Sequence, residues 1–254
     1  MRVGLFGDWG TDIYWVGRVH GLSAEAPIPV LKDAYCVVLP GMAGNVASLF
    51  GKLGVEVVSV YGDTPRQLPI KNRLVTQDGV QLARWDCQDT CTPPTEIELL
   101  SMDLGSLDAF VVCDYGKGGV TDDVIRFIQL NSKIFDLPIF VDTKSDPIAW
   151  LGSRCILTPN HEEYLRYKSS YDWLSVVLHK MSGDGIEYLA WGRSICHHRA
   201  EAINVRNVCG AGDAVLAAAT RAYLEDKGPE KLLEYVSWRA ANYVESLWSE
   251  RDVI

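Results

Sequence analysis

The sequence predicts an α/β protein built on a mostly parallel sheet with helices on both faces. Short apolar, strand-like runs alternate with helical stretches along most of the 254 residues, which is typical of a parallel sheet covered on both sides. Polar residues follow several of these runs directly, and open α/β sheets bind ligands at the carboxyl ends of their strands. A glycine-flanked turn then opens an alanine-rich helix that begins near residue 210.

The expected elements are short and follow one another in order. Apolar runs define the strands, and turn or capping residues define where each helix starts. We expect strands at 2–6, 55–61, 109–113, 138–142 and 155–158, with two more around 188 and 195. We expect helices at 46–54, near 91, at 121–130, from 161, after 212 and from 229, and a glycine turn at 40–45 that opens the first of them.

Two segments fall outside this alternation and are expected to form a small β lid. The first, at about 13–34, alternates apolar and polar residues and contains prolines, which suit an edge strand. The second, at about 70–87, centres on Asp78-Gly79, a dipeptide that favours a β-hairpin. Because small isolated sheets gain stability by pairing, we expect a homodimer formed through this lid.

Charge and composition exclude several classes of function. A net charge of −9 argues against a general nucleic-acid surface, although a few local cations would suffice for a small phosphorylated substrate. The amino terminus reaches Gly7-Asp8 too soon for a signal peptide, and no apolar run approaches the ~20 residues of a membrane span. We therefore expect a cytoplasmic protein that binds neither membrane nor nucleic acid.

The seven cysteines are expected to be free thiols in a reducing compartment, because none forms a Cys-x-x-Cys pair. Cys196-His197-His198 invites a metal interpretation, but no partner ligand stands at a useful spacing.

The stretch around Gly210 and Gly212 is the strongest candidate for chemistry. These glycines bracket Ala211, so the backbone can approach a ligand without a Cβ clash. The helix that follows leaves its first N–H groups unpaired and carries a partial positive charge at that end, which suits phosphate oxygens. Asp213 stands in the first turn, where it can take a proton from a bound hydroxyl. The alternative is a glycine turn whose aspartate only caps the helix.

Several motifs, taken in order, resemble the PfkB-type carbohydrate kinases, the ribokinase-like family, and most closely its heptose 7-phosphate kinases of the ADP-heptose pathway. The likeness covers most of the chain, and several spaced motifs are more specific than any one of them. They are Gly-Asp at 7–8 with the segments 12–15 and 23–30, Pro-Gly-Met-Ala-Gly-Asn-Val-Ala at 40–47, Cys-Asp-Tyr-Gly-Lys-Gly at 113–118, Val-Asp-Thr-Lys at 141–144, Leu-Thr-Pro-Asn-His-Glu-Glu at 157–163 and Asn-Val-Cys-Gly-Ala-Gly-Asp at 207–213.

The resemblance implies a ribokinase-like fold and an ATP-dependent sugar kinase that uses Mg²⁺. The acceptor it implies is heptose 7-phosphate, which would become heptose 1,7-bisphosphate. Two alternatives stay open: a kinase for another sugar or a nucleoside, and a catalytically silent homologue that binds sugar or nucleotide. Retention of a base and a magnesium motif favours an enzyme over a silent binding protein.

The same resemblance assigns roles to individual residues. Asp213 would be the general base, and Gly210, Ala211 and Gly212 would form the anion hole. Asn160 and Glu163 match the family's Asn-x-x-Glu motif, which acts on magnesium and phosphate partly through water, as suits a cation that keeps its own waters. The remaining candidates are Asp12, Gly41 and Asn45 for sugar hydroxyls, Lys71, Arg73 and Lys117 for the substrate's own phosphate, and Lys144 for the nucleotide phosphates. Asp12 is also open to interpretation as a turn-capping residue.

The chain departs from the family pattern at several points. Met42 stands where the family usually has a second glycine, which would stiffen the hinge of lid closure. Asn207 replaces the usual aspartate, which weakens any inference of a monovalent cation site. The segments 63–70 and 192–200 and the chain after 224 look abbreviated, and the last two bear on the adenine pocket. We interpret 1–254 as a single, pared-down kinase domain, without the nucleotidyltransferase domain that is fused to some heptose kinases.

Overall fold

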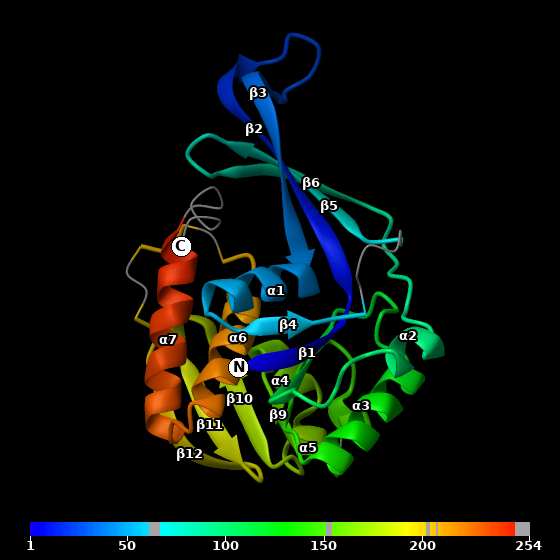
Figure 1. Cartoon of the computed structure of the whole chain (residues 1–254). Helices are drawn as coiled ribbons and strands as arrows, with labels where there is room; N and C mark the ends of the chain where they lie inside the picture. Colours follow the sequence, from blue (N-terminus) through cyan, green and yellow to red (C-terminus); the bar gives the residue numbers. More distant parts are fainter. Residues whose placement is uncertain (61–66, 151–153, 202–203, 207, 247–254) are drawn as a thin grey trace.

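The computed structural model of the chain describes residues 1–60, 67–150, 154–201, 204–206 and 208–246, and these form two sheets (Figure 1). The larger has eight strands in the order β12-β11-β10-β9-β8-β7-β1-β4. Its strands are β1 (Arg2–Gly7), β4 (Glu56–Val58), β7 (Ala109–Asp114), β8 (Ile139–Thr143), β9 (Cys155–Leu157), β10 (Val176–Lys180), β11 (Ile186–Ala190) and β12 (Arg193–His198). The strands from β4 to β10 pair in parallel and only β11 and β12 pair antiparallel, so the predicted, mostly parallel sheet is confirmed.

Helices cover both faces of this sheet, as predicted. One face carries α1 (Ala43–Lys52), α6 (Ala211–Leu224) and α7 (Pro229–Glu245). The other carries α2 (Glu96–Leu100), α3 (Asp122–Phe135), α4 (His161–Arg166) and α5 (Lys168–Tyr171). The short 3-10 turns η1 (Pro147–Trp150) and η2 (Ser182–Asp184) complete the described elements.

The central strands are apolar along their whole length because both of their faces are buried. Successive residues of a strand point to opposite faces, and in β1 Leu5 packs with the cluster under α1 and α6 while Phe6 packs with the cluster under α3. In β7 Val111 and Val112 divide in the same way. A continuous apolar run is thus what a parallel strand between two helical layers requires.

Strand β10 was not predicted. Its apolar part is brief and is followed by His179 and Lys180, both polar, which makes the run look like a loop in the sequence. In the structure His179 is 4% exposed, and β10 is nonetheless a central strand between β9 and β11. This segment is a strand because it pairs with β9 and β11, and a local sequence pattern does not reveal that pairing.

The second sheet is the predicted lid, and it projects from one end of the main layer (Figure 1). Its strands are β2 (Trp9–Leu22), β3 (Pro29–Met42), β5 (Ile70–Thr76) and β6 (Gln81–Cys87), in the order β3-β2-β5-β6. The predicted hairpin turn is present, with Gly79 at φ 91°. β2 and β3 are longer than the predicted 13–34 segment because their paired part continues down to the main layer, where Trp9 pairs with Met42.

The lid enters the main layer without the glycine turn expected at 40–45. β3 ends at Met42 and α1 begins at the next residue, Ala43. Met42 is 4% exposed and has φ 57° and ψ −126°, a conformation that costs a residue with a side chain about 1–3 kcal/mol. The strand-to-helix junction is therefore strained at the position where the sequence predicts a hinge. Asn207, the other departure singled out in the sequence, lies outside the described residues.

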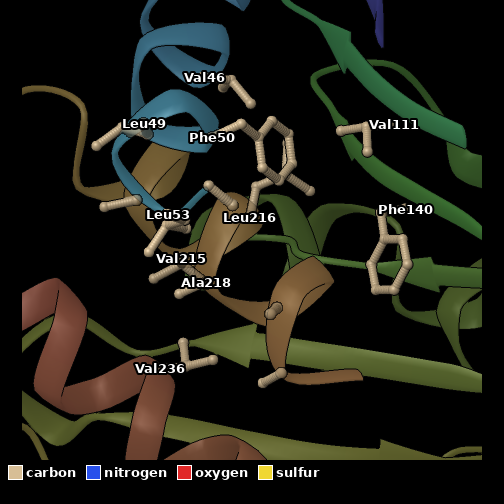
Figure 2. Packing of buried hydrophobic residues seen from close by; sticks show 14 of the residues in the cluster. Val46, Leu49, Phe50, Leu53, Val111, Phe140, Val215, Leu216, Ala218 and Val236 are labelled. Carbon is tan, nitrogen blue, oxygen red and sulfur yellow. The ribbon is translucent and has the colours of Figure 1, made fainter. Parts of the chain in front are cut away.

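A cluster of buried apolar side chains fills the space between the sheet and helices α1 and α6. Figure 2 shows Phe50 of α1 lying against Leu216 of α6, with Val46 beside them. Phe50 and Leu216 are both 0% exposed. This packing fixes α1 and α6 relative to each other, and both helices carry predicted site residues at their amino-terminal ends.

Replacing Phe50 with alanine is expected to destabilise the fold by about 3–5 kcal/mol, because it removes buried apolar surface and leaves a cavity between two helices. Urea unfolding followed by circular dichroism measures the loss. Phe135→Ala is the matched control, since Phe135 is 44% exposed at the end of α3. Equal destabilisation by the two substitutions would contradict this account of the core.

No helix in the described part of the chain is both long and apolar enough to cross a membrane.

Candidate functional site

A cavity of about 470 Å³ lies between the lid and the carboxyl ends of the central strands. Its walls come from the lid, from the segments that follow β7, β8, β9 and β10, and from the amino-terminal turn of α6. The predicted site residues that line it are Asp12, Asn45, Lys71, Arg73, Lys144, Asn160, Gly210, Ala211, Gly212 and Asp213. The structure thus brings most of the predicted residues together from distant parts of the sequence. Gly41, Lys117 and Glu163 are not among the lining residues, and each is placed separately below.

Asp213 lies at the buried base of this cavity and is 7% exposed. Its carboxylate accepts a hydrogen bond from Asn45 Nδ2 at 2.7 Å and another from the hydroxyl of Tyr115. Burial raises the pKa of Asp213 to about 6, although both hydrogen bonds act in the opposite direction. The side chain does not cap α6, so the capping alternative is wrong, and the group is a carboxylate whose pKa lies close to neutral pH.

The amino-terminal turn of α6 is open toward the cavity. Its N-cap residue is Gly210, at φ 81°, and no side chain of the described residues caps the helix. A Cβ on Gly210 would lie 2.3 Å from Tyr243 Oη and 2.8 Å from Asn45 Nδ2, so glycine is required there. Uncapped N–H groups at a helix amino terminus attract anions, so this turn could hold an anion beside Asp213.

Asn160 and Glu163 are joined in a capping box at the start of α4. Asn160 Oδ1 accepts from the amide of Glu163 at 2.8 Å, and Glu163 Oε2 accepts from the amide of Asn160 at 2.9 Å. The other oxygen of Glu163 pairs with Lys144, and Glu163 is only 5% exposed. Asn160 lines the cavity, whereas Glu163 stands behind it.

This donor set fits a magnesium ion only through water. The oxygens of Asn160 and Glu163 already accept hydrogen bonds, and among the described residues no cluster of three or more His, Cys, Asp or Glu could hold a metal. Magnesium commonly keeps several waters and takes its remaining ligands from substrate phosphates. Asn160 at the cavity wall, with Glu163 behind it, is placed to hold such waters.

Within the described part of the chain, Cys196, His197 and His198 belong to no group of side chains that could hold a metal ion. His197 Nε2 lies 2.7 Å from the carbonyl of Asp184, and His198 Nε2 lies 2.8 Å from Glu201 Oε1.

Lys180 and Asp142 form a buried ion pair in the cavity wall that sequence analysis missed. Lys180 Nζ lies 3.0 Å from Asp142 Oδ1, and the two side chains are 13% and 7% exposed. Asp142 belongs to a motif quoted above, at the end of β8, but was given no role there. Lys180 ends β10, the unpredicted strand, so its position at the carboxyl edge of the sheet could not be foreseen.

The lid side of the cavity carries a carboxylate and cations. Arg73 Nη2 lies 3.5 Å from Asp12 Oδ1, its Nη1 donates to Gln81 at 3.2 Å, and its guanidinium stands 5.8 Å from the centre of the Tyr14 ring. Asp12 lies within β2, so it does not cap a turn. A Cβ on Gly41 would approach Asp12 Oδ2 to 3.1 Å, so Gly41 leaves room for that carboxylate and does not itself reach the cavity.

In the described part of the chain, Arg73 and Lys71 are the two cations on the lid side of the cavity. Arg73 Nε is buried and has no hydrogen-bond partner in the described residues. Lys71 stands over the Tyr115 ring, with Nζ 5.5 Å from its centre, and burial lowers the pKa of its ammonium group. Both cations line the cavity, and Arg73 is already in contact with the Asp12 carboxylate.

Lys117 lies outside the cavity lining, and its ammonium pairs with Asp89 at 2.5 Å. Its loop is shaped by Asp8, which is fully buried and accepts from the amides of Tyr115, Lys117 and Gly119 at 2.7, 3.0 and 2.7 Å. Asp8 was noticed in the sequence only as part of a motif. In the structure it holds the loop that presents Tyr115 to Asp213.

Comparisons with known proteins agree with this architecture. No family model matches the chain. It is 28% identical over 268 residues to the bifunctional protein HldE of Hyphomonas neptunium, covering 87% of this chain and 55% of that protein. It is 29% identical over 264 residues to HldE of Escherichia coli O9:H4, covering 86% and 55%. The chain thus spans about half the length of the curated relatives it matches.

Solved structures share the fold at low sequence identity. Arabidopsis thaliana ribokinase, complexed with ribose and ATP, superimposes with a TM-score of 0.72 at 18% identity, over 96% of this chain and 92% of that one. Phosphofructokinase-2 of Escherichia coli, in complex with fructose-6-phosphate, gives 0.74 at 14% identity, over 98% and 95%. The predicted ribokinase-like fold and the resemblance to these carbohydrate kinases are confirmed.

Tyr115→Phe is expected to raise the pKa of Asp213 above about 6, because the lost hydrogen bond stabilises the ionised carboxylate. A ¹³C NMR titration of the aspartate carboxyl groups measures the shift, with the Asp213 signal assigned by its absence in Asp213→Asn. Tyr35→Phe is the control, since Tyr35 is 50% exposed on the lid. An unchanged or lower pKa of Asp213 in Tyr115→Phe would refute the role given to this hydroxyl.

Proposed function

We propose that this ribokinase-like chain is a sugar kinase that transfers the γ-phosphoryl group of ATP to a sugar hydroxyl, with heptose 7-phosphate as acceptor and heptose 1,7-bisphosphate as product. The observation that carries the proposal is the buried Asp213 beside the open amino terminus of α6, at the base of a cavity with cations on opposite sides. The likeness to HldE proteins and to a ribokinase complexed with ribose and ATP supports it.

The arrangement suits phosphoryl transfer, in which a protein mainly positions groups and neutralises charge. The sugar oxygen would form a bond to the γ-phosphorus as the bond from that phosphorus to the bridging oxygen of ATP breaks. The proton of the attacking hydroxyl would go to Asp213. With a pKa of about 6, this carboxylate is mostly ionised at neutral pH yet more basic than an exposed aspartate. Amide groups at Gly212 and Asp213 would face the oxygens of the phosphoryl group in transit.

The nucleotide phosphates are assigned to the wall that carries Lys144, Asn160 and Glu163. Lys144 supplies a cation and Asn160 an amide at the cavity surface, while Glu163 orients both through hydrogen bonds. When bound, Mg²⁺ would neutralise charge on the phosphates, with waters toward Asn160 and Glu163. A kinase that draws on ATP is assigned to the cytoplasm, where this substrate is present.

The acceptor's own phosphate is assigned to the lid side, where Lys71 and Arg73 face the cavity. A chain of net charge −9 needs such local cations to hold a dianionic substrate. Lys71 is not paired to a carboxylate by any described salt bridge, whereas Arg73 is already in contact with Asp12. Lys117 stays in this set as a weaker candidate, because a phosphate would have to compete with Asp89 for its ammonium.

Asp213→Asn is expected to lower kcat by about 10²–10⁴-fold while sugar and ATP still bind, because the anion hole remains intact. In the unmutated protein kcat/KM should fall as pH is lowered through about 6, since protonated Asp213 cannot accept the hydroxyl proton. A coupled assay of ADP release with a panel of free and phosphorylated sugars, at several pH values, measures both effects.

Thermal unfolding separates this role from a structural one. Because burial raises the pKa of Asp213, its ionised form disfavours the folded state at neutral pH. Asp213→Asn should therefore unfold at a temperature no lower than that of the unmutated protein. Near-normal turnover in the variant would exclude Asp213 as the base. Binding of sugar and nucleotide without turnover in the unmutated protein would favour the silent-homologue alternative.

Lys71→Met is expected to lower kcat/KM for heptose 7-phosphate by roughly ten- to a hundredfold, because a charge-assisted contact contributes ~1.5–3 kcal/mol. Turnover of the unphosphorylated heptose should not change. Lys117→Met should have a smaller effect, and Lys133→Met is the control, since Lys133 is exposed on α3. Equal use of both heptoses by the unmutated protein would replace heptose 7-phosphate with another sugar or nucleoside as acceptor.

The proposed assembly is a homodimer formed through the lid. Several large apolar side chains are exposed on its strands, among them Trp15 at 40%, Tyr35 at 50% and Val38 at 61%. Sedimentation velocity should show a dimer, and Val38→Glu should shift it to monomer by placing a charge on the covered face. Leu165→Glu, at a side chain 59% exposed on α4, is the matched control. A monomer throughout the micromolar range would rule out this assembly.

A further inference from the structure

The end of β10 places an ammonium group beside the anion hole. A Cβ built on Gly212 would lie 3.2 Å from Lys180 Nζ, so the ammonium rests directly against the second residue of α6. Lys180 also lines the cavity. Glycine at position 212 leaves room for this close approach, since a side chain there would crowd the ammonium.

The position of Lys180 is fixed from several directions. Its ammonium donates to Asp142, which also accepts from the hydroxyl of Thr158 at 3.2 Å. Its backbone amide donates to the carbonyl of Pro159 at 2.8 Å, and Lys180 forms an isolated parallel bridge with Asn160. The strand that carries the lysine is thus tied to the Asn160–Glu163 motif, and the ammonium is held in a defined place.

A structural role alone does not account for this pair. Taking two charges out of water costs free energy that a buried ion pair often fails to recover, and apolar residues would fill the same space without that cost. The pair also stands at the cavity surface, where it is accessible to a ligand. Lys144 with Glu163 repeats the pattern in the same wall, so two ammonium groups, each held by a carboxylate, flank the phosphate side of the site.

We propose that Lys180 is a catalytic residue that contacts the γ-phosphate of the bound nucleotide and stays with the phosphoryl group during its transfer. The inference rests on the proposed kinase function and extends it to a residue on an unpredicted strand. Asp142 is its positioning residue, because it holds the ammonium next to Gly212 and touches no reacting atom.

The chemistry needs no additional reactant. The bond from the γ-phosphorus to the bridging oxygen breaks, the bond to the sugar oxygen forms, and the hydroxyl proton goes to Asp213. Lys180 keeps its proton throughout and supplies fixed positive charge to the equatorial oxygens, where charge is concentrated in the transition state. An ammonium already aligned by Asp142 does this without reorganising at the moment of reaction.

Lys180→Met tests the proposal, because methionine removes the charge and keeps an unbranched chain. We expect kcat to fall about 100-fold or more, as happens when a group that stabilises transition-state charge is removed, with little change in KM for the sugar. Calorimetry with Mg²⁺ should show that the non-hydrolysable analogue AMP-PNP binds about tenfold more weakly. ADP, which lacks the γ-phosphate, should bind as before.

Two control variants separate catalysis from folding. Lys180→Met alone leaves Asp142 buried without its cation, so it is expected to lower the unfolding temperature. The double variant Lys180→Met/Asp142→Asn should regain that temperature while kcat stays low. Lys168→Met, which removes an exposed ammonium paired with Asp172, should leave kcat and both nucleotide affinities unchanged.

The outcomes distinguish this inference from the kinase proposal beneath it. If the unmutated protein phosphorylates a sugar and Lys180→Met does so equally well, the kinase function stands and the role of Lys180 is overturned. If the unmutated protein turns over no sugar, the kinase proposal fails, and the affinities for AMP-PNP and ADP then decide whether Lys180 contacts the γ-phosphate. A selective loss of AMP-PNP affinity in Lys180→Met then supports the γ-phosphate contact, and equal effects on AMP-PNP and ADP refute it.

Discussion

The site depends on one buried carboxylate, Asp213, whose charged form is disfavoured by burial. Burial alone would drive its pKa higher than about 6, and the hydrogen bonds from Asn45 and Tyr115 limit the rise. Each donor is held in place separately. Asn45 lies on α1, and Tyr115 lies on a loop whose backbone amides donate hydrogen bonds to Asp8. Residues of α1, of this loop and of α6 thus meet at one carboxylate.

The same constraint explains why the cations of the cavity are arranged in pairs. The proposed nucleotide phosphates would need positive charge in the cavity, yet unpaired ammonium groups would be costly to bury before a ligand arrives. The buried Lys180 is paired with Asp142 in this way, and the more exposed Lys144 is paired with Glu163. On the lid side Lys71 and Arg73 stand over the rings of Tyr115 and Tyr14, which stabilise cations, and Arg73 is also in contact with Asp12.

The sequence was most informative where one physical requirement acts locally. Glycines at 210 and 212, apolar runs such as that of β7 and the turn at Asp78-Gly79 predicted the fold and the base of the site. Prediction from the sequence failed where an element or a side chain depends on partners that are distant in the chain. β10 is a strand because its neighbours make it one, so Lys180 was missed, and the buried roles of Asp8 and Tyr115 exist only once their loop is folded. Motif position placed Lys117 with the cavity cations, whereas the structure pairs it with Asp89.

The junction between the two sheets links the lid to the catalytic geometry. Met42 ends β3 with a backbone conformation that glycine would adopt without strain, and its side chain is packed so closely that a Cβ on Gly10 would lie 2.7 Å from its sulfur. Asn45, the donor to Asp213, follows one helical turn later. Because a packed methionine resists the rotation that a glycine would permit, the orientation of the lid and the hydrogen bond from Asn45 to Asp213 depend on the same few residues. The lid that carries Asp12, Lys71 and Arg73 is in this way held in register with the carboxylate at the bottom of the cavity.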